Sequence, residues 1–398
     1  MFVLDVTPVT YRNPWESSFD LRKRKLGTGC INLVYLYEAP DTSTFRYRVY
    51  NMIQAIETTD SDLNAVYFTY DEIDGLRGMA EKVDILVLCR CRYTHKLNEL
   101  VSILKRRGAQ VVFDVDDLVF NPSYVNLIVD TLDQDLAHPG VWDHWFAYTA
   151  RIGEALRLCD YAVTTNEFLG ARITEYSGLD AAVVPNFLNR EQIQISDKLF
   201  QQKKNSEFMR NELFHIGYFS GTPSHNKDFR IIEPALINLL KEFSNLRILV
   251  VGYLNPSTTF GQFSDRVQSF PLHDFVNLQR IISLVEVNVV PLQDNIFTNC
   301  KSELKFFEAA MVGTVTLASP TFCYRRAIDD ALNGFLVNSY EWEERISQTM
   351  KGMERYQDIV DAARQYASTN YAPEGQVAAI RGALRLPASR EIGRARVS

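Results

Sequence analysis

The chain has 398 residues, which is too long for one ordinary hydrophobic core, so two domains are expected. Its hydrophobic fraction of 46% and charged fraction of 23% are those of a globular protein. The net charge of −7 excludes a general nucleic-acid-binding protein, because such a protein needs a basic surface to displace counterions from phosphates.

The first half of the chain predicts alternating strands and helices after an extension of residues 1–28 that shows little periodicity. We expect strands at 31–39, 64–70, 83–91, 109–117, 161–165 and 181–187. We expect helices at 45–56, 95–108, 142–158 and 168–178. Several of these strands are continuous apolar runs, which are typical of a parallel sheet buried on both faces. This order predicts an α/β domain with a doubly wound sheet over residues 29–195.

Residues 196–212 interrupt the alternation, because this segment is polar and charged, and we predict a linker there. The pattern then restarts and predicts a second α/β domain over 213–366. Strands are expected at 214–220, 246–253, 287–292, 315–319 and 334–338, and helices at 229–243, 276–285, 301–313, 325–332, 341–356 and 359–368. A C-terminal helical segment (367–387) is expected to pack back on the first domain, before a tail of residues 388–398. Ligands of such sheets lie beyond the carboxyl ends of the strands, so two facing edges predict an interdomain cleft.

The six cysteines form no CxxC pair and no Cys/His spacing that suits zinc, and most lie in apolar strings. This usage predicts reduced thiols and a cytoplasmic protein. The first residues lack the order of a signal peptide, and no apolar run is long enough to cross a bilayer. Any membrane association is therefore expected to be peripheral, at the inner face. The basic run LRKRK (21–25) is interpreted as a solvated charge run in preference to a contact with anionic lipid.

The segment KSELKFFEAAMVG (301–313) predicts a helix with an unusual polar face. At about 100° per residue, Lys301, Lys305 and Glu308 fall within roughly 60° of one another. Ser302 is the expected N-cap and Gly313 the expected residue just past the helix. Two lysines at a helix N-terminus oppose each other and the helix dipole, unless an anion lies there. The pattern indicates a diphosphate site with Glu308 as a ribose ligand, and the alternative is a surface helix with ordinary ion pairs.

A glycine-bearing loop lies between a predicted strand and a predicted helix at 214–229. Gly217 and Gly221 permit close approach of the backbone to a ligand, and Lys227 precedes the helix. The loop matches neither the Walker pattern nor GxGxxG, and glycine in such a place more often marks a turn. His225 is interpreted as a loop hydrogen-bonding residue.

Four segments of the second half resemble, in this order, the C-terminal half of retaining GT-B glycosyltransferases of the family-4 type. They are GYFSGTPSHNKDF, VVGYL, VNVVPLQDN and NCKSELKFFEAAMVGTVTLAS. The first half is similar through its strand order and VVFDVDD. The resemblance covers residues 30 to 385. It implies a GT-B fold, made of two Rossmann-like domains, and transfer of a sugar from a nucleoside diphosphate with retention of configuration. The implied acceptor is a cell-surface polysaccharide, glycolipid or glycoprotein.

The resemblance also implies roles for single residues. Lys227 would contact the donor diphosphate, the Lys301–Ser302–Lys305 segment would cover the phosphates, and Glu308 would hold the ribose. The other implied donor-binding residues are Gly221, Gly252, Leu272 and Asn299. Asp116 takes the place of a histidine beside the reacting sugar, with Lys227 and Lys305 as its catalytic companions.

Two departures from the family pattern affect the sugar-binding details. The position eight residues before Glu308, where the family often has a first glutamate, is Cys300, and Asn299 or Glu303 are the candidate substitutes. The arginine usual in the first glycine loop is replaced by Tyr218, and Lys301 or Lys305 would supply its charge.

The expected chemistry needs no cofactor, because lysines and a helix N-terminus can stabilise a leaving diphosphate without a metal ion. Asp114, Asp116 and Asp117 are candidates for a magnesium or manganese site, for capping the following loop, or for a role near the sugar or acceptor. Arg46, Arg48 and Asp117 are candidates for the acceptor or phosphate side. Of the two arginines at most one is expected to face the substrates.

Two weaker candidates, Asn166 and Glu167, follow a predicted strand. The conclusion from the sequence is a glycosyltransferase with a nucleotide-sugar donor and a glycan, glycolipid or glycoprotein acceptor, without a nucleic-acid partner. The alternatives are a nucleotide-sugar epimerase of the same fold and a catalytically silent module that binds sugar nucleotides.

Overall fold

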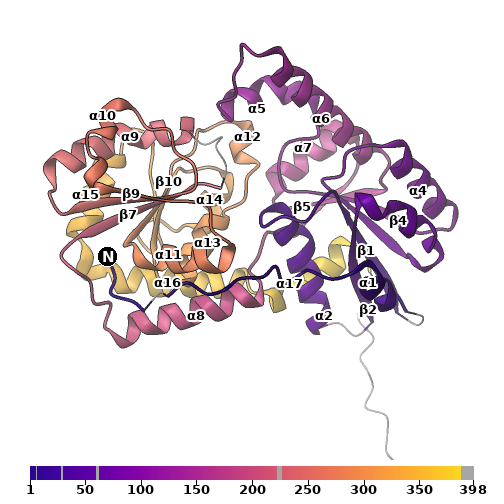
Figure 1. Ribbon diagram of the computed structural model, residues 1–398, viewed down its shortest axis with the longest axis horizontal. Helices are drawn as coiled ribbons and strands as arrows, with labels where there is room; N and C mark the ends of the chain where they lie inside the picture. The colour runs from indigo at the N-terminus through magenta and orange to yellow at the C-terminus, as the bar shows by residue number, and fades with distance from the viewer. Residues whose placement is uncertain (6, 28–29, 60–61, 222–225, 387–398) are drawn as a thin grey trace, which may run out of the picture. The chain divides into compact units, whose positions relative to one another are not determined.

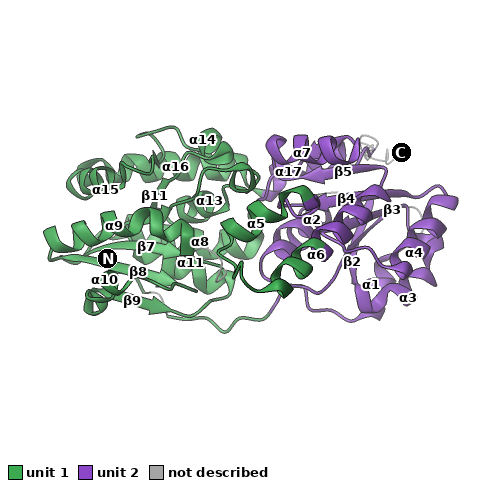
Figure 2. Ribbon diagram, turned by 90° about the horizontal axis from the view of Figure 1, so that it is seen from above, with its two compact units in different colours: residues 1–12, 123–146, 188–372 green, residues 13–122, 147–187, 373–398 purple. Residues whose placement is uncertain are grey.

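The computed structural model describes residues 1–5, 7–27, 30–59, 62–221 and 226–386. His225 and the tail of residues 388–398 lie outside them. The chain divides into two compact units (Figure 2). Unit 1 contains residues 1–12, 123–146 and 188–372, and unit 2 contains residues 13–122, 147–187 and, of the described residues, 373–386.

Unit 2 is built on a parallel sheet of six strands. These are β1 (Ile31–Tyr37), β2 (Leu63–Thr69), β3 (Ile85–Cys89), β4 (Gln110–Val115), β5 (Tyr161–Thr164) and β6 (Ala181–Val183). Their order in the sheet is β2-β1-β3-β4-β5-β6, and every pairing is parallel. All five residues of β3 are buried, as expected for a strand covered on both faces.

The helical elements of unit 2 precede, connect and follow these strands. They are α1 (Phe19–Lys25), the π-helical η1 (Arg46–Tyr50), α2 (Asn51–Thr59), η2 (Tyr70–Glu72), α3 (Ile73–Arg77), η3 (Ala80–Lys82), α4 (His95–Arg106), α7 (Glu167–Ser177) and α17 (Pro373–Ala383). Two further elements, η4 (Pro122–Tyr124) and α6 (Pro139–Arg157), cross from one unit to the other. Helix α17 packs against α2 within unit 2. The basic run of 21–25 forms α1 and is exposed except at Arg22, which is buried and pairs with Glu72 at 2.6 Å.

Unit 1 contains the second parallel sheet. Its strands are β7 (Phe214–Phe219), β8 (Leu246–Val251), β9 (Val267–Phe270), β10 (Val287–Val290), β11 (Val315–Ala318) and β12 (Phe335–Leu336). They lie in the order β12-β11-β10-β7-β8-β9. The helical elements are α5 (Val125–Thr131), α8 (Arg190–Asn205), α9 (Asn226–Glu242), α10 (Thr258–Gly261), η6 (Ser264–Arg266), α11 (Phe275–Leu284), α12 (Ile296–Asn299), α13 (Leu304–Met311), α14 (Phe322–Ala327), α15 (Trp342–Lys351), η7 (Met353–Arg355) and α16 (Tyr356–Asn370).

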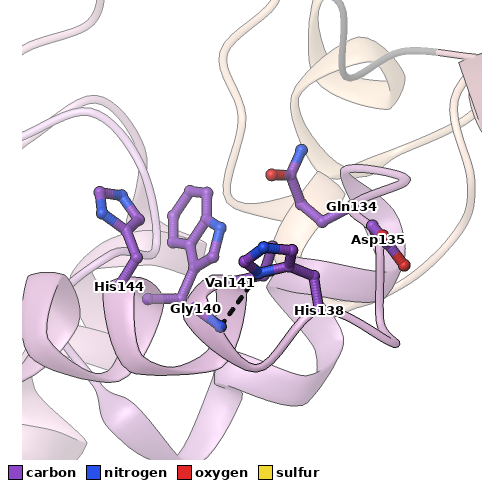
Figure 3. A pocket seen from close by; sticks show the side chains of 7 residues that line it. Gln134, Asp135, His138, Gly140, Val141 and His144 are labelled. Carbon is purple, nitrogen blue, oxygen red and sulfur yellow. Dashed lines mark hydrogen bonds between the residues drawn. The ribbon is translucent and has the colours of Figure 1, made fainter.

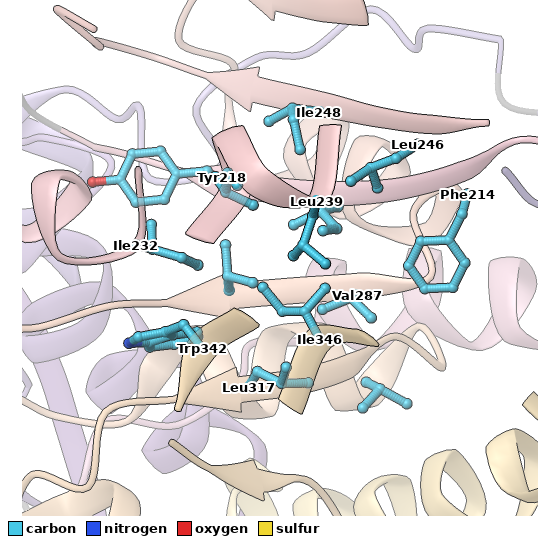
Figure 4. Close-up of a cluster of buried hydrophobic side chains, with 14 of the residues drawn as sticks. Phe214, Tyr218, Ile232, Leu239, Leu246, Ile248, Val287, Leu317, Trp342 and Ile346 are labelled. Atoms are coloured by element: carbon cyan, nitrogen blue, oxygen red, sulfur yellow. The ribbon is translucent and has the colours of Figure 1, made fainter. Parts of the chain in front are cut away.

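Helices cover both faces of the sheet in unit 1 (Figure 1). On one face, α9 and α15 bury a large cluster against β7, β8 and β10, with Tyr218 and Trp342 at one end of it (Figure 4). On the other face, α8, α11 and α13 cover Phe219 and Leu249. The two-residue periodicity of β7 therefore sends Tyr218 to one layer and Phe219 to the other.

The two sheets confirm the predicted α/β class, but the prediction for residues 196–212 needs a correction. Most of this segment belongs to α8 in unit 1 and does not form a linker. Its Leu199, Phe200 and Lys203 are buried, and α8 packs on α11. The polar residues that suggested a linker form the exposed side of an amphipathic helix.

The structure also differs from the predicted elements at β9 and at the N-terminus. β9 was not predicted, because this edge strand has only four residues and none of them is fully buried. The predicted extension is part of the fold: Phe2 is buried in unit 1 and bridges to Arg210, and Trp15 is buried in unit 2. Among the described residues, no helix is both long enough and apolar enough to cross a membrane.

Candidate functional site

The carboxyl ends of β7, β8 and β9 in unit 1 bring Ser220, Gly252 and Leu272 together. Gly252 has a φ of +95°, and a Cβ placed on it would lie 1.9 Å from the Ser220 carbonyl oxygen and 3.3 Å from Leu272 Cδ2. Only glycine fits this position without moving the backbone. Gly221, just beyond Ser220, is exposed and has open space around it, so its glycine is not required by packing.

Helix α13 begins slightly later than the sequence predicted. Its N-cap position is held by Glu303 and not by Ser302, and Lys301 lies in the turn between α12 and α13. Gly313 follows the C-cap with a φ of +66°, which confirms its predicted place just past the helix. The predicted apolar face, formed by Phe306, Phe307, Ala310 and Met311, is buried.

Lys305 lies in the first turn of α13, and its Nζ is 5.8 Å from the centre of the Tyr218 ring. Burial lowers the pKa of Lys305 to about 8, and the nearby charge of Lys301 acts in the same direction, while Asp228 and Glu308 raise the pKa in part. Burial also raises the pKa of the Tyr218 hydroxyl, so Tyr218 stays neutral beneath the ammonium group. A partly desolvated cation at the strand ends is a strong electrostatic partner for an anion.

Asp228 fixes the loop that follows β10. Its side chain is 2% exposed, and its Oδ1 accepts hydrogen bonds from Gln293 N and Gln293 Nε2, both at 3.1 Å. The same carboxylate is the largest charge that opposes the pKa depression of Lys305. Asp228 was missed from the sequence, where it is simply the residue after Lys227.

Lys227 has a partner from an earlier part of the chain. Its Nζ lies 2.6 Å from Asp130 Oδ1, at the end of α5, and Arg230 lies 3.4 Å from Asp133. Thr131 accepts hydrogen bonds from Gln293 Nε2 at 3.2 Å and from Asn295 Nδ2 at 3.1 Å. Residues 130–133 are therefore fastened to the strand-end loops of unit 1, a contact that no local pattern indicates.

Glu308, the predicted ribose ligand, is 4% exposed, and its Oε1 accepts a hydrogen bond from Gln192 Nε2 of α8 at 3.2 Å. The candidate substitute Glu303 is also nearly buried and accepts a hydrogen bond from the Tyr371 hydroxyl at 2.5 Å. Both carboxylates thus have partners within unit 1. Gln192 could not be recognised from the sequence, because it lies 116 residues from Glu308.

The remaining predicted donor residues lie around the same loops. Asn299 donates to Asp294 Oδ1 and accepts a hydrogen bond from Phe322 N, so it holds the turn before α13. Lys301 Nζ lies 4.6 Å from the centre of the Phe297 ring. Ser302 is partly exposed in the same turn.

In unit 2, Asp116 follows β4 and accepts hydrogen bonds from Thr44 Oγ1 at 2.8 Å and from Arg90 Nη1 at 3.4 Å. Arg90, at the end of β3, has a φ of +50°, in the left-handed region that residues other than glycine seldom adopt. Neither Thr44 nor Arg90 was predicted, because the fold brings them to Asp116 from other strand ends. Asp117 accepts a hydrogen bond from Leu118 N at 3.0 Å and so caps the loop.

The two candidate arginines are both buried, which corrects the prediction for Arg48. Arg48 has no exposed side-chain surface and holds Asp114 through two hydrogen bonds of 2.8 Å. It also donates to Val184 O, and it therefore serves the fold and not a ligand. Arg46 is 5% exposed, donates to Thr42 O and stacks on Tyr47.

The other polar candidates of unit 2 are placed by local structure. Asn166 is the N-cap of α7, and Glu167 lies in the first turn of that helix. Asp114 lies within β4 and is paired with Arg48, so it does not join Asp116 and Asp117, which follow the strand. In the part of the chain that the structure describes, no three His, Cys, Asp or Glu side chains are grouped as metal ligands.

No protein-family model and no curated protein sequence matches the chain. Solved structures do match it. HepE of Anabaena in complex with UDP and glucose has a TM-score of 0.59 at 13% identity, over 89% of this chain and 99% of that one. A glycosyltransferase of Rickettsia africae has a TM-score of 0.59 at 13% identity, over 89% and 97%. Sucrose-phosphate synthase of Thermosynechococcus elongatus has a TM-score of 0.58 at 13% identity, over 89% and 98%.

These similarities, together with the two parallel sheets, show the fold. It is the GT-B type with two Rossmann-like domains, as predicted from the sequence.

Proposed function

We propose that the protein is a glycosyltransferase that moves a sugar from a nucleoside diphosphate to the hydroxyl of a glycan, glycolipid or glycoprotein, with retention at the anomeric carbon. The observation that carries the proposal is Lys305, a partly buried cation in the first turn of α13, close to Tyr218 of β7. Structures of the same fold include HepE in complex with UDP, which makes UDP the first nucleotide to test.

The chemistry follows from the charge that develops during the reaction. As the anomeric C–O bond breaks, negative charge builds on the diphosphate and the sugar becomes oxocarbenium-like. The acceptor oxygen forms the new bond, and the proton of its hydroxyl passes to the leaving diphosphate. Lys305, Lys301 and Lys227 would stabilise the leaving diphosphate in fixed positions, which requires no reorganisation during the step. Gly252 and Leu272 would border the nucleoside, and Glu308 would hold the ribose. In unit 2, Asp116 is the group proposed to act near the sugar.

The proposal is tested first by thermal shift with UDP, GDP, ADP, CDP and TDP. A nucleotide that binds only the folded protein stabilises it by about 2.7 kcal/mol at a concentration of 100 Kd, so the correct base raises the melting temperature. The sugar nucleotides of that base are then incubated with and without acceptor, in the presence of a chelator. Release of the diphosphate with transfer of the sugar supports the proposal. An epimerised sugar nucleotide as the product, or a rate abolished by the chelator, contradicts it.

The pKa of Lys305 predicts how nucleotide affinity depends on pH. The side chain is charged below a pKa of about 8 and loses its proton above it. We therefore expect a nearly constant Kd for the nucleoside diphosphate up to about pH 7, a Kd about twofold higher at pH 8, and a rise of up to about tenfold per unit above that. Titration calorimetry at several pH values measures this. Lys305→Arg stays charged and should remove the rise, so an unchanged profile in that variant would assign the titration to another group.

The ion pair between Lys227 and Asp130 predicts the effect of removing the carboxylate. If Lys227 binds the diphosphate, Asp130 competes with the ligand for the same ammonium group. Asp130→Ala is expected to lower the Kd of the nucleotide by about two- to fivefold, because partly exposed ion pairs contribute up to about 1 kcal/mol. Asp133→Ala, which frees Arg230, is the matched control and should leave the Kd unchanged. Weaker nucleotide binding by Asp130→Ala would show that this pair positions Lys227 productively.

A further inference from the structure

A pocket lies in unit 1, on the segment that joins α5 to the first turns of α6 (Figure 3). Its volume is about 450 Å³, and it is a shallow hollow that is more open to solvent than enclosed, so it suits a ligand that lies on the surface, such as a sugar ring. The side chains that line it are those of Gln134, Asp135, His138, Val141, His144 and Trp145. None of these residues was a candidate from the sequence.

The pocket is lined by both apolar and polar side chains. Trp145 and Val141 provide flat or aliphatic surface, while an amide, a carboxylate and two imidazoles provide hydrogen-bond donors and acceptors. The His144 ring stands at 88° to the Trp145 indole, with 5.7 Å between ring centres. The surface of the pocket is mainly apolar, with a few polar groups beside it. A ligand that lays a C–H face on the indole and offers some hydroxyl groups to these polar groups fits this lining, and a sugar ring is such a ligand.

The loop that forms the pocket is held by its own hydrogen bonds. His138 Nδ1 accepts a hydrogen bond from Gly140 N at 3.1 Å (Figure 3), and Asp135 Oδ1 accepts one from Ala137 N at 3.0 Å. Trp142 lies on the same helix but outside the lining, and its Nε1 donates to Leu136 O at 3.0 Å. The lining residues are therefore presented on a loop with defined structure, which lowers the cost of ordering it around a ligand.

In the sequence, the residues that line the pocket directly follow the residues that contact the proposed donor loops. Asp133 pairs with Arg230, Asp130 pairs with Lys227, and Gln134 is the next residue along the chain. Because both the pocket and the donor loops belong to unit 1, their connection does not depend on the placement of unit 2.

The charge of the segment limits the class of ligand. Residues 130–146 contain four aspartates, Asp130, Asp133, Asp135 and Asp143, and no lysine or arginine. Asp130 and Asp133 pair with Lys227 and Arg230, so the negative charge beside the pocket comes from Asp135 and Asp143. An anionic membrane or an anionic polysaccharide would be repelled, since each needs basic side chains at its surface. A neutral, hydroxylated ligand meets no such cost.

We propose that this pocket is an acceptor subsite that binds a neutral sugar ring against the Trp145 indole. The inference rests on the proposed function, since an acceptor is meaningful only for a transferase. The proposal specifies that the acceptor carries an uncharged saccharide and that residues 134–145 bind it.

The test measures saccharide binding separately from nucleotide binding. Cellobiose, maltose, lactose and N,N′-diacetylchitobiose are titrated against the full chain by ligand-observed NMR. At least one is expected to bind saturably, and Trp145→Ala should weaken that binding by about fivefold or more. His138→Ala removes an exposed lining side chain and should weaken it by a smaller factor. Phe146→Ala changes a neighbouring exposed aromatic residue outside the lining and should leave it unchanged.

The outcomes separate this inference from the proposed function. The thermal shift with the nucleotide should be the same in all three variants, which also reports that each is folded. Binding of none of the four saccharides, or equal binding by wild type, Trp145→Ala and His138→Ala, overturns the subsite. Binding to phosphatidylglycerol vesicles that is lost in Trp145→Ala overturns it in favour of a membrane contact. Failure of every nucleotide to bind counts against the proposed function, whatever the saccharides do.

Discussion

Replacing Lys305 by alanine is expected to lower kcat for sugar transfer by about 10²- to 10³-fold, which is the typical effect of removing one fixed donor from a developing anion. The reason is the position of the ammonium group, which is partly buried above Tyr218 in the first turn of α13. A cation that is already desolvated interacts more strongly with a diphosphate than an exposed lysine does. The rate is measured as release of the nucleoside diphosphate, with the sugar nucleotide that the thermal-shift panel identifies.

The matched control is Lys204→Ala, which removes an exposed lysine of unit 1 that pairs with Asp361 on the surface. It should retain the wild-type rate, because a surface ion pair has little influence on stability or on a distant anion. Lys305→Arg keeps the charge but changes its shape, and it is expected to retain part of the activity. A Lys305→Ala variant with an unchanged kcat and a normal melting temperature would show that this helix is only structural.

The fold was predictable because its strands carry a strong local signal. β3, β7 and β10 are short apolar runs between turns, and each was placed within a few residues of its observed bounds. The hydrophobic pattern did not predict elements that are only partly buried or are buried on one side. β9 is an edge strand with an exposed centre, and α8 has so many charged residues on its outer side that it resembled a linker.

The candidate site was predictable only where it depends on local conformation. Gly252 and Gly313 have positive φ values, and a glycine next to a strand or helix end indicates such a conformation. The partners of the charged residues were not predictable, because they come from distant parts of the chain. Asp130 reaches Lys227 from 97 residues away, and Gln192 reaches Glu308 from 116. Spacing along one helix contains no information about such contacts.

The same limit explains why Arg48 was misjudged. On the sequence, an arginine near the start of a helix after β1 is a candidate phosphate ligand. In the structure the π-helical η1 turns Arg48 inward, where it meets Asp114 on the central strand β4 and the backbone near Val184. A fully buried ion pair has a different energetic role from an exposed one, because each charge depends on the other to offset its lost hydration.

Asp114→Ala is therefore expected to lower the free energy of unfolding by about 3–5 kcal/mol, since it leaves the guanidinium of Arg48 buried without its counter-charge. The side chains of Arg48 and Asp114 are 0% and 2% exposed, so water cannot replace the lost partner without opening unit 2. Urea unfolding measures the change. Trp15 is buried in unit 2 against Phe45, and the other three tryptophans lie in unit 1, so fluorescence reports on unit 2 alone when Trp142, Trp145 and Trp342 are replaced by phenylalanine in every variant compared.

Two further variants distinguish the burial of a charge from the mere loss of a contact. Glu38→Ala breaks the half-exposed pair with Arg92 in the same unit, and should cost no more than about 1 kcal/mol. The double variant Arg48→Met, Asp114→Leu removes both charges and should be clearly more stable than Asp114→Ala, because no unpaired charge remains. If the double variant were instead as unstable as the sum of its single variants, the coupling energy between Arg48 and Asp114 would be zero. The unsatisfied charge would then not be the cause of the loss.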